Sequence, residues 1–335
     1  MSTDDNAPAT VARRLLRELA FQDWLVVAYL SILTVAAVCG PESPARLGFV
    51  VRMGSMLGVC VLVLVLVRGR LLQGRFFAPL AHRLAIHGTV QLSYFLFRDF
   101  LPYVNPGTFD AKLYWIDVHV LHFEPSLFTA RFSTPLVTEW FAFFYFSYFF
   151  LIVVHVFPLV YFSRRTKLLA EFALGVLLCF GIGHVGYMLV PGYGPVRELQ
   201  GLYGGALPEG FWMRLVNDAV RTGGAQKDIF PSLHTAMPVY VALFSFRHRD
   251  KLPFRYTWPI VAFFAANIVI ATMFLRWHWL IDVVAGLVLS VSVFFASSRL
   301  SPREVRRRQI AGLSPVWGSF FRTPDEKRGM TSSAP

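Results

Sequence analysis

Two short segments combine histidine with residues that can handle a phosphate group. The first reads Phe-Pro-Ser-Leu-His-Thr at 230–235 and the second reads Arg-Trp-His-Trp-Leu-Ile-Asp at 276–282. A carboxylate four residues after a histidine can hold one ring nitrogen and leave the other as a nucleophile. A second histidine can exchange a proton with the leaving and entering oxygens. The pattern indicates phosphoryl transfer through a covalent intermediate, with His278 as nucleophile, Asp282 as its orienting partner and His234 as acid and base.

Four further residues are candidates for binding the phosphate oxygens. Arg276 opens the second segment, and Arg197 ends the run Pro-Gly-Tyr-Gly-Pro-Val-Arg at 191–197. A guanidinium group can hold two phosphate oxygens at once. Ser232 lies where the unpaired N–H groups of a helix start attract anions, and Lys227 is a weaker candidate nearby.

Zinc binding is a second interpretation of the same side chains. His234, His278 and Asp282 are acceptable zinc ligands by type, yet a metal would repel Arg197 and Arg276 and leave them without a role. The three cysteines lie inside apolar runs, without the close spacing of a metal site or a disulfide framework. We therefore expect no metal and no cofactor.

The composition places these segments in a membrane protein. Hydrophobic residues make up 55% of the 335 residues and charged residues only 16%, which is too apolar for an ordinary water-soluble globule. The formal net charge of +12 is spread over short basic clusters between apolar runs, as in residues that set membrane topology. Nucleic-acid binding, which such a charge can also indicate, is therefore not expected.

Eight apolar runs are long enough to cross a bilayer as helices. A hydrocarbon core of about 30 Å needs about 20 helical residues. The runs cover residues 21–39, 47–67, 84–103, 135–162, 168–190, 229–247, 256–275 and 278–298. The sequence thus predicts an all-α, polytopic membrane bundle without a soluble domain. The first run follows several arginines, as a signal peptide would, but Asp23 and the seven later runs favour a retained anchor.

The basic residues predict the orientation of this bundle. With eight spans, 22 Lys and Arg fall on the side of both chain ends and eight fall on the other side. The richer side is expected to be cytoplasmic. The connections near 104–134 and 191–228 are then expected to face outward, which places both histidine segments at the periplasmic face of a bacterial inner membrane.

This topology predicts how the two segments meet. Both spans that carry them run from outside to inside, so both helices begin at the outer face, one with Pro231 in its first turn and the other with His278 at its start. Asp282 then lies one turn after His278 on the same helix face. Two converging helix N-termini carry partial positive charge and predict an anion site.

Other polar and aromatic residues are expected to have mainly structural roles. His184 is the best further candidate because a polar group inside a membrane is expensive, although a hydrogen bond to a neighbouring helix explains it equally well. Arg98 and Asp99 could pair with each other or line a cavity. The aromatic run within 135–162 is attributed to packing, and the mixed segment 110–135 to a helix in the headgroup zone.

The two segments resemble the type 2 phosphatidic acid phosphatase superfamily, whose second motif reads Pro-Ser-x-His and whose third ends in His-x-x-x-Asp. The resemblance implies the same roles for His278, Asp282 and His234, and a six-helix catalytic core that matches spans three to eight. The superfamily's first motif, a Lys followed by a distant Arg-Pro, is missing. The run at 191–197 replaces it and, together with Tyr-Val-Asn-Pro-Gly-Thr-Phe-Asp at 103–110, looks like the inositol phosphorylceramide synthase branch.

That branch transfers a phospho-headgroup between lipids, so the resemblance implies a membrane phospholipid as donor and a lipid or water as acceptor. A lipid phosphate or prenyl diphosphate phosphatase is the alternative enzyme, because it would use the same catalytic residues. A non-catalytic lipid transporter or scaffold is the alternative of another class. The expected organisation is a cytoplasmic segment 1–20, two amino-terminal helices in 21–83, the catalytic core 84–298 and a basic cytoplasmic tail 299–335.

Overall fold

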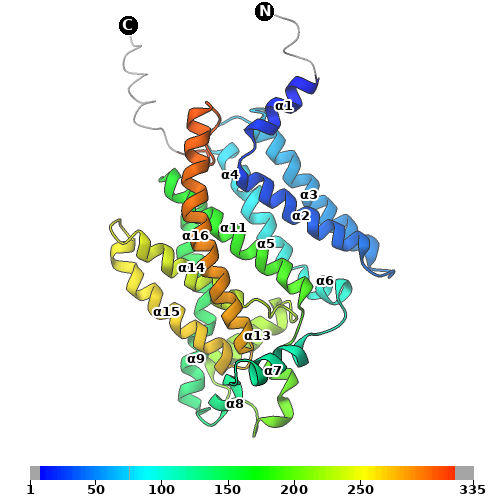
Figure 1. Ribbon diagram of the computed structural model, residues 1–335, viewed down its shortest axis with the longest axis vertical. Coiled ribbons are helices and arrows are strands. Elements are labelled where there is room, and N and C mark those ends of the chain that lie inside the picture. Colours follow the sequence, from blue (N-terminus) through cyan, green and yellow to red (C-terminus); the bar gives the residue numbers. More distant parts are fainter. Residues whose placement is uncertain (1–7, 75, 321–335) are drawn as a thin grey trace, which may run out of the picture.

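The computed structural model describes residues 8–74 and 76–320 (Figure 1). Their regular structure is helical throughout, with no strand in these ranges, which confirms the prediction of an all-α protein. The elements are α1 (Pro8–Glu18), α2 (Phe21–Cys39), α3 (Arg46–Arg68), α4 (Phe77–Arg83), η2 (Leu84–Gly88), α5 (Thr89–Tyr94), α6 (Phe97–Val104), α7 (Asp110–His119), α8 (Pro125–Ala130), α9 (Pro135–Leu151), η3 (Ile152–Val156), α10 (Phe157–Phe162), α11 (Thr166–Leu189), α12 (Pro195–Glu198), η4 (Gln200–Leu202), α13 (Phe211–Gly223), α14 (Leu233–Arg247), α15 (Phe254–Phe274) and α16 (Leu280–Ile310).

Six helical segments of the described chain are long and apolar enough to cross a membrane. They are α2, α3, the continuous helix Pro135–Phe162 formed by α9, η3 and α10, then α11, α15 and α16. Helices of this length and composition identify an integral membrane protein, in agreement with the sequence-based prediction.

Two of the eight predicted spans are not long, regular helices. Residues 84–103 belong to a series of short helices, α4, η2, α5 and α6, that is interrupted after Tyr94 and contains Pro102. A π-helical turn and a proline without an N–H group both disturb the regular hydrogen bonding of an α-helix. The span predicted at 229–247 begins only at Leu233, which leaves 15 residues. The count of eight crossings therefore remains a prediction.

Helix α11 provides the surface on which the first histidine segment lies. Glycines on α11 let this segment approach the helix closely. A Cβ atom at Gly186 would lie 2.5 Å from Pro231 Cδ and 2.8 Å from the Phe230 carbonyl oxygen, and one at Gly183 would lie 2.6 Å from the Leu233 side chain. Small residues allow this kind of close helix packing in membranes, and here they fix the position at which α14 begins.

The helix ends gather at two opposite faces of the bundle. In Figure 1, α1 and the carboxyl end of α16 lie at the top, whereas α7, α8 and the start of α16 lie at the bottom. The starts of α14 and α16 share the bottom face, because the Ser232 N–H donates to the Asp282 carbonyl oxygen at 3.1 Å. The first and last described helices therefore meet at the face opposite the histidine segments, as the predicted topology requires.

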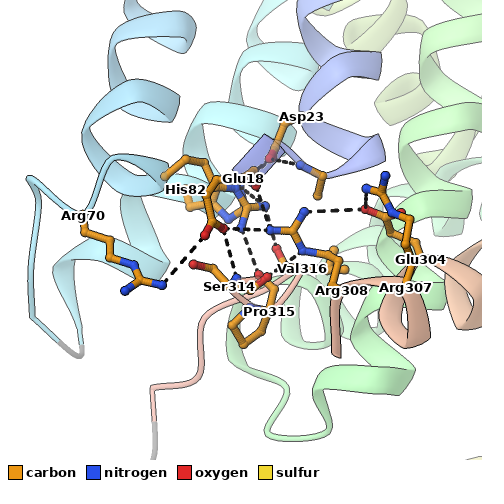
Figure 2. A network of polar contacts seen from close by, with 12 residues as sticks. Glu18, Asp23, Arg70, His82, Glu304, Arg307, Arg308, Ser314, Pro315 and Val316 are labelled. Carbon is orange, nitrogen blue, oxygen red and sulfur yellow. Dashed lines mark hydrogen bonds and ion pairs between the residues drawn. The ribbon is translucent and has the colours of Figure 1, made fainter. Parts of the chain in front are cut away.

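A buried polar network at the top face joins the amino-terminal helices to the segment that follows α16 (Figure 2). Asp23 of α2 accepts a hydrogen bond from Arg68 Nε at 2.7 Å and lies 2.8 Å from His82 Nε2. Arg68 also donates to the carbonyl oxygens of Pro315 at 2.9 Å and Val316 at 3.0 Å. The network therefore spans elements that lie at opposite ends of the sequence.

The same segment is fixed at two further points. Trp317 is 1% exposed and packs on the rings of His82 and His87. Arg308 of α16 donates through Nη2 to the Glu18 carbonyl oxygen at 2.7 Å. Residues 299–310 of the predicted tail thus continue α16, and Val316 and Trp317 of the following segment are buried against the bundle. The remainder of that tail, 321–335, and residues 1–7 lie outside the described residues.

Candidate active site

Helix α14 begins directly after the Phe-Pro-Ser motif. Ser232 is the N-cap, and its Oγ accepts a hydrogen bond from the Thr235 N–H at 3.2 Å. Pro231 therefore lies before the helix, so the prediction that it belongs to the first turn is wrong. His234, the second residue of α14, stacks on Tyr145 with ring centroids 4.5 Å apart. Its Nε2 atom is buried without a hydrogen-bond partner among the described residues.

His278 precedes α16 instead of starting it. Trp279 is the N-cap, and Asp282, the third helical residue, accepts the Trp279 N–H with Oδ2 at 2.9 Å. The prediction that His278 and Asp282 lie on successive turns of one helix is therefore wrong in detail, although the two side chains do meet. His278 Nδ1 lies 3.5 Å from Asp282 Oδ2, a distance longer than a normal hydrogen bond.

Burial governs the charge of His278. It lowers the pKa of the imidazole from 6.5 to about 4, because an imidazolium is poorly solvated in this position, and the negative charge of Asp228 acts in the opposite direction. His278 is therefore neutral near pH 7. A neutral imidazole has a lone pair with which it can attack an electrophile.

Backbone contacts hold the two histidine segments at a fixed separation. The hydrogen bond from Ser232 to Asp282 joins them, and the ring centroids of His234 and His278 lie 6.1 Å apart. Gly286, one turn beyond Asp282, permits this approach, because a Cβ atom there would lie 2.6 Å from the Ser232 carbonyl oxygen. The spacing of the histidines thus depends on a residue without a side chain.

Replacing Gly286 with alanine is expected to reduce turnover about 100-fold in a protein that still folds. The new methyl group must displace the backbone at Ser232, and a shift on the order of 1 Å between catalytic groups costs about 100-fold in rate. The control is Gly48→Ala in α3, where the Cβ position has no atom within 4 Å. Turnover numbers of both variants check the prediction, and a Gly286→Ala enzyme as fast as the wild type would contradict it.

Asp110, the first residue of α7, braces the loop at 191–197. Its carboxylate accepts the N–H groups of Tyr193 at 2.9 Å and Gly194 at 2.8 Å, and the indole N–H of Trp279 at 3.1 Å. Gly194 has φ +83°, and its Cβ position lies 2.3 Å from the Trp277 carbonyl oxygen, so only glycine fits there. One buried carboxylate therefore connects the loop to the start of α16.

Asp117, also on α7, occupies backbone N–H groups at the start of α16. Its carboxylate accepts from Leu280 at 2.7 Å and from Ile281 at 2.9 Å. Asp282 accepts the Trp279 N–H in the same way. Carboxylates therefore accept three of the N–H groups that a helix start leaves unpaired. The expectation that α16 offers these groups to a phosphate is therefore wrong for all three.

Through Asp117, the stability of the protein is expected to fall as the pH rises from about 4 to about 7. Burial raises the pKa of this carboxyl from 3.8 to about 7, against the two backbone hydrogen bonds, which favour the charged form. A carboxyl group with a raised folded-state pKa stabilises the fold fully below its unfolded pKa. That contribution is lost as the pH rises through the folded value.

The measurement is the unfolding temperature in detergent of the wild type and of Asp117→Asn, whose amide cannot titrate. The wild type should lose stability relative to the variant up to about pH 7 and then stay level. A difference that is constant across this range, or that grows in favour of the wild type, would contradict the prediction.

A cavity of about 610 Å³ lies beside both histidines. His234 and His278 form part of its wall, together with four tyrosines of α5, α9 and α11. The lining also includes Arg197, exposed in the connection after α11, and Phe149 and Val153, which are 41% and 63% exposed on the long helix α9–η3–α10. The cavity therefore joins polar residues at the bottom face to apolar residues on the side of the bundle.

The two predicted phosphate-binding arginines lie in different surroundings. Arg197 lines the cavity, and its guanidinium lies 3.9 Å above the Tyr193 ring. The preceding residue, Val196, donates its N–H to the Arg276 carbonyl oxygen at 2.7 Å. The Arg276 side chain stacks 3.7 Å above Tyr203 and is not among the residues that line the cavity.

The other two predicted phosphate ligands already hold backbone groups. Lys227 Nζ donates to the carbonyl oxygens of three consecutive residues, 105–107, at 2.9 to 3.2 Å. An ammonium has three donors, so this lysine is fully engaged, and Ser232 is engaged as the N-cap. The structure thus gathers His234, His278 and Arg197 around the cavity, with Asp282 behind His278.

Residues not selected from the sequence also belong to this site. Tyr145 and Tyr148 pack on His234 with centroids 4.5 and 4.3 Å away, so the aromatic run of 135–162 shapes the site as well as packing the bundle. Asp228 lines the cavity and accepts a hydrogen bond from the Tyr94 hydroxyl at 2.7 Å. In the sequence, Asp228 could have been noticed as an acidic residue six positions before His234.

The positions of the described His, Cys, Asp and Glu side chains bear on the zinc interpretation. Within residues 8–74 and 76–320, no group of three or more His, Cys, Asp or Glu side chains is placed to hold an ion. The interpretation of His234, His278 and Asp282 as a zinc site therefore gains no support from their geometry.

A comparison with protein families matches this region of the chain. The model of the PAP2 superfamily, the type 2 phosphatidic acid phosphatases, aligns with residues 116–296, which is more than half of the chain and includes both histidine segments. The chain belongs to the PAP2 superfamily. No curated protein and no solved structure matches it.

PAP2 membership gives the general class of activity. The superfamily consists of phosphoesterase-type enzymes, so a phosphoester is the general class of substrate. The match covers α8 to α15 completely and leaves α2 and α3 outside it. It carries no information on the inositol phosphorylceramide synthase branch, on the lipid or on the acceptor.

Proposed function

We propose that this PAP2 protein transfers a phospho-headgroup from a membrane phospholipid to a lipid alcohol, as inositol phosphorylceramide synthases do. The observation that carries the proposal is the cavity, which runs from the exposed Arg197 past His234 and His278 to apolar residues on the side of the bundle. An amphipathic phospholipid can place its phosphate between the histidines and its chains toward the bilayer.

In the first step, a lone pair of His278 attacks the phosphorus atom. Asp282 faces Nδ1, so Nε2 is the nitrogen that forms the bond. As the bond between phosphorus and the lipid oxygen breaks, His234, protonated beside the phosphate anion, donates its proton to that oxygen. Arg197 is the candidate to stabilise the charge on the remaining phosphate oxygens.

In the second step, the acceptor hydroxyl replaces the first lipid. Its oxygen attacks phosphorus, its proton goes to His234, and the bond between phosphorus and nitrogen breaks with its electron pair returning to His278. The histidines regain their starting states, and the acceptor carries the headgroup. The protein supplies nucleophile, proton transfer and positioning without an added cofactor.

The membrane arrangement that fits this chemistry has eight crossings with both chain ends in the cytoplasm. The broken series α4 to α6 and the short helix α14 then supply the two crossings beyond the six long helices. The excess of Lys and Arg at the face of α1 and the end of α16 supports this orientation. The histidines then lie at the periplasmic face of a bacterial inner membrane.

Hydrolysis is the alternative reaction, with water in place of the lipid alcohol. It is favoured by the exposed residues Thr222 and Gln226 in the cavity lining, since they give water a route to the histidines. A lipid phosphate or a prenyl diphosphate would then be the substrate. A non-catalytic transporter or scaffold would use the same cavity without forming a covalent intermediate.

Trapping the intermediate tests the proposal. Purified protein in nanodiscs is incubated with phospholipids labelled in the headgroup phosphate, quenched and digested, and the label is expected on the peptide that contains His278. Added lipid alcohol should then discharge the label into a new lipid. Release of labelled headgroup to water alone would favour the hydrolase, and loss of activity with a chelator that zinc restores would overturn the histidine mechanism.

A further inference from the structure

A second group of polar side chains lines the cavity on the side of α5 and α11. It consists of Tyr94, His184 and Asp228. The Tyr94 hydroxyl donates to Asp228 Oδ2 at 2.7 Å, and the Tyr94 ring stacks on the His184 ring with centroids 5.9 Å apart. Since the charge of Asp228 acts on His278, the group extends the polar lining from the catalytic candidate into α11.

His184 is 1% exposed, and its two ring nitrogens lie in different surroundings. Nδ1 lies 2.8 Å from the Tyr29 hydroxyl, which in turn lies 2.5 Å from Ser93 Oγ. Ser93 Oγ also donates to the Val90 carbonyl oxygen at 2.7 Å. Nε2 is buried without a hydrogen-bond partner among the described residues, in a side chain that lines the cavity.

The hydroxyl hydrogens of Ser93 and Tyr29 determine whether Nε2 of His184 carries a hydrogen or a lone pair. Ser93 has one hydroxyl hydrogen, which goes to Val90, so Ser93 Oγ accepts from Tyr29 and the Tyr29 oxygen accepts from His184 Nδ1–H. This direction makes three hydrogen bonds, whereas the reverse direction makes two and leaves the Ser93–Val90 contact unused. The additional bond favours the first direction. We assign the proton to Nδ1, so that Nε2 presents a lone pair.

A lone pair in the wall of a lipid cavity requires a donor on the ligand. A buried acceptor without a partner is unfavourable, and neither a phosphodiester nor an acyl ester carries a donor. A hydroxyl or an amide N–H does. His184 lies five residues before the end of α11 at Leu189, roughly 7 Å along the helix axis, which is a depth at which the first polar linkages of a lipid lie.

We propose that His184 is a specificity-determining residue, whose Nε2 accepts a hydrogen bond from an amide N–H of the lipid that receives the headgroup. The Tyr29–Ser93 pair fixes the tautomer that makes this possible. The inference rests on the proposed transfer to a lipid alcohol. It predicts that the cavity distinguishes acceptor lipids by a donor group below the reacting hydroxyl.

Two probes that differ in one N–H group test this directly. A long-chain N-acylethanolamine and its N-methyl derivative are titrated into the full-length protein in nanodiscs, without phospholipid donor. The wild type is expected to bind the N–H probe about tenfold more tightly, the effect of one hydrogen bond. His184→Phe should bind both probes equally, at the level of the weaker one. Equal binding of the two probes to the wild type would overturn the proposal.

Ser93→Ala provides a test that leaves the histidine in place. Without Ser93 Oγ, the Tyr29 hydroxyl donates to His184 Nδ1 and the proton moves to Nε2, so the preference for the N–H probe should disappear. The control is His155→Phe, a histidine of η3 that does not line the cavity, and it should keep the tenfold preference. A preference that survives in both His184→Phe and Ser93→Ala would also overturn the proposal.

The result of the probe experiments can be distinguished from the result of the test of the proposed transfer reaction. If no covalent intermediate forms on His278, the transfer mechanism fails. The difference in binding between the two probes still tests the role of His184 independently. If the intermediate forms and transfers its headgroup equally to both probes with equal KM values, the reaction stands and the role of His184 fails.

Discussion

Alanine in place of His278 is expected to lower turnover by at least about 10⁴-fold. Without the nucleophile no covalent intermediate can form, and only binding and electrostatic stabilisation remain, as in hydrolases that lose a residue of their catalytic triad. The measurement is the transfer of labelled headgroup from phospholipid in nanodiscs, together with the label retained on the protein. Both signals should disappear, because both depend on the same bond to His278.

The matched control is His119→Ala, which removes an exposed histidine of α7 that does not line the cavity. It should leave transfer unchanged. The His278→Ala protein should unfold at nearly the wild-type temperature and still bind phospholipid, so that a loss of activity reports on chemistry. Full lipid movement by this variant without any transfer would support a transporter, and transfer at the wild-type rate would refute His278 as the nucleophile.

Methionine in place of Arg68 is expected to lower the free energy of unfolding by about 3–5 kcal/mol. The change leaves Asp23, which is 0% exposed, without its guanidinium partner, and removing one member of a buried ion pair costs about this amount because the other charge stays buried. The carbonyl oxygens of Pro315 and Val316 lose their donor as well. Thermal and denaturant unfolding in detergent measure the loss.

Arg70→Met is the control for this change, because Arg70 is 63% exposed and its closest carboxylate lies 3.8 Å away. An exposed pair of this kind contributes little. Limited proteolysis gives a second measure, since the segment after α16 should become cleavable in Arg68→Met before the bundle unfolds. Equal stability of the Arg68 and Arg70 variants would show that the network does not hold the two ends of the chain together.

The catalytic candidates could be found from the sequence because their spacing is local. Pro-Ser-x-His and His-x-x-x-Asp specify residue types within a few positions, and they led to His234, His278 and Asp282 without knowledge of the fold. The apolar runs likewise predicted the six long helices. Helix starts were less predictable: α14 begins at Leu233 and α16 at Leu280, four and two residues after the predicted starts at 229 and 278, because the N-caps Ser232 and Trp279 set the first turns.

The residues that support the site could not be found in this way, because their partners lie far along the chain. Asp117 and Asp110 act on the start of α16 across 163 and 169 residues. No periodicity or spacing in the sequence records such a contact. Their acidic side chains in a mixed apolar segment indicate an interfacial helix equally well, and only the fold shows that they are buried and hold backbone N–H groups.

The candidate phosphate ligands illustrate a related limit. Arg276 and Lys227 have the right charge and lie close to the motifs in sequence, yet Arg276 lies outside the cavity lining, with Nη1 donating to the Gly205 carbonyl oxygen, and Lys227 donates to the carbonyl oxygens of residues 105–107. A sequence reports which groups can bind an anion. Whether a nearer backbone acceptor has already taken them depends on loops whose course the sequence does not specify.

The network in Figure 2 has a consequence for how the protein is made. Arg68 enters the membrane region with the second long helix, whereas Pro315 and Val316 emerge from the ribosome some 247 residues later. While the intervening helices are synthesised, Arg68 lacks the carbonyl oxygens of Pro315 and Val316 as acceptors. A chain that stops before residue 315 therefore lacks two of the carbonyl oxygens to which the buried Arg68 guanidinium donates in the complete protein.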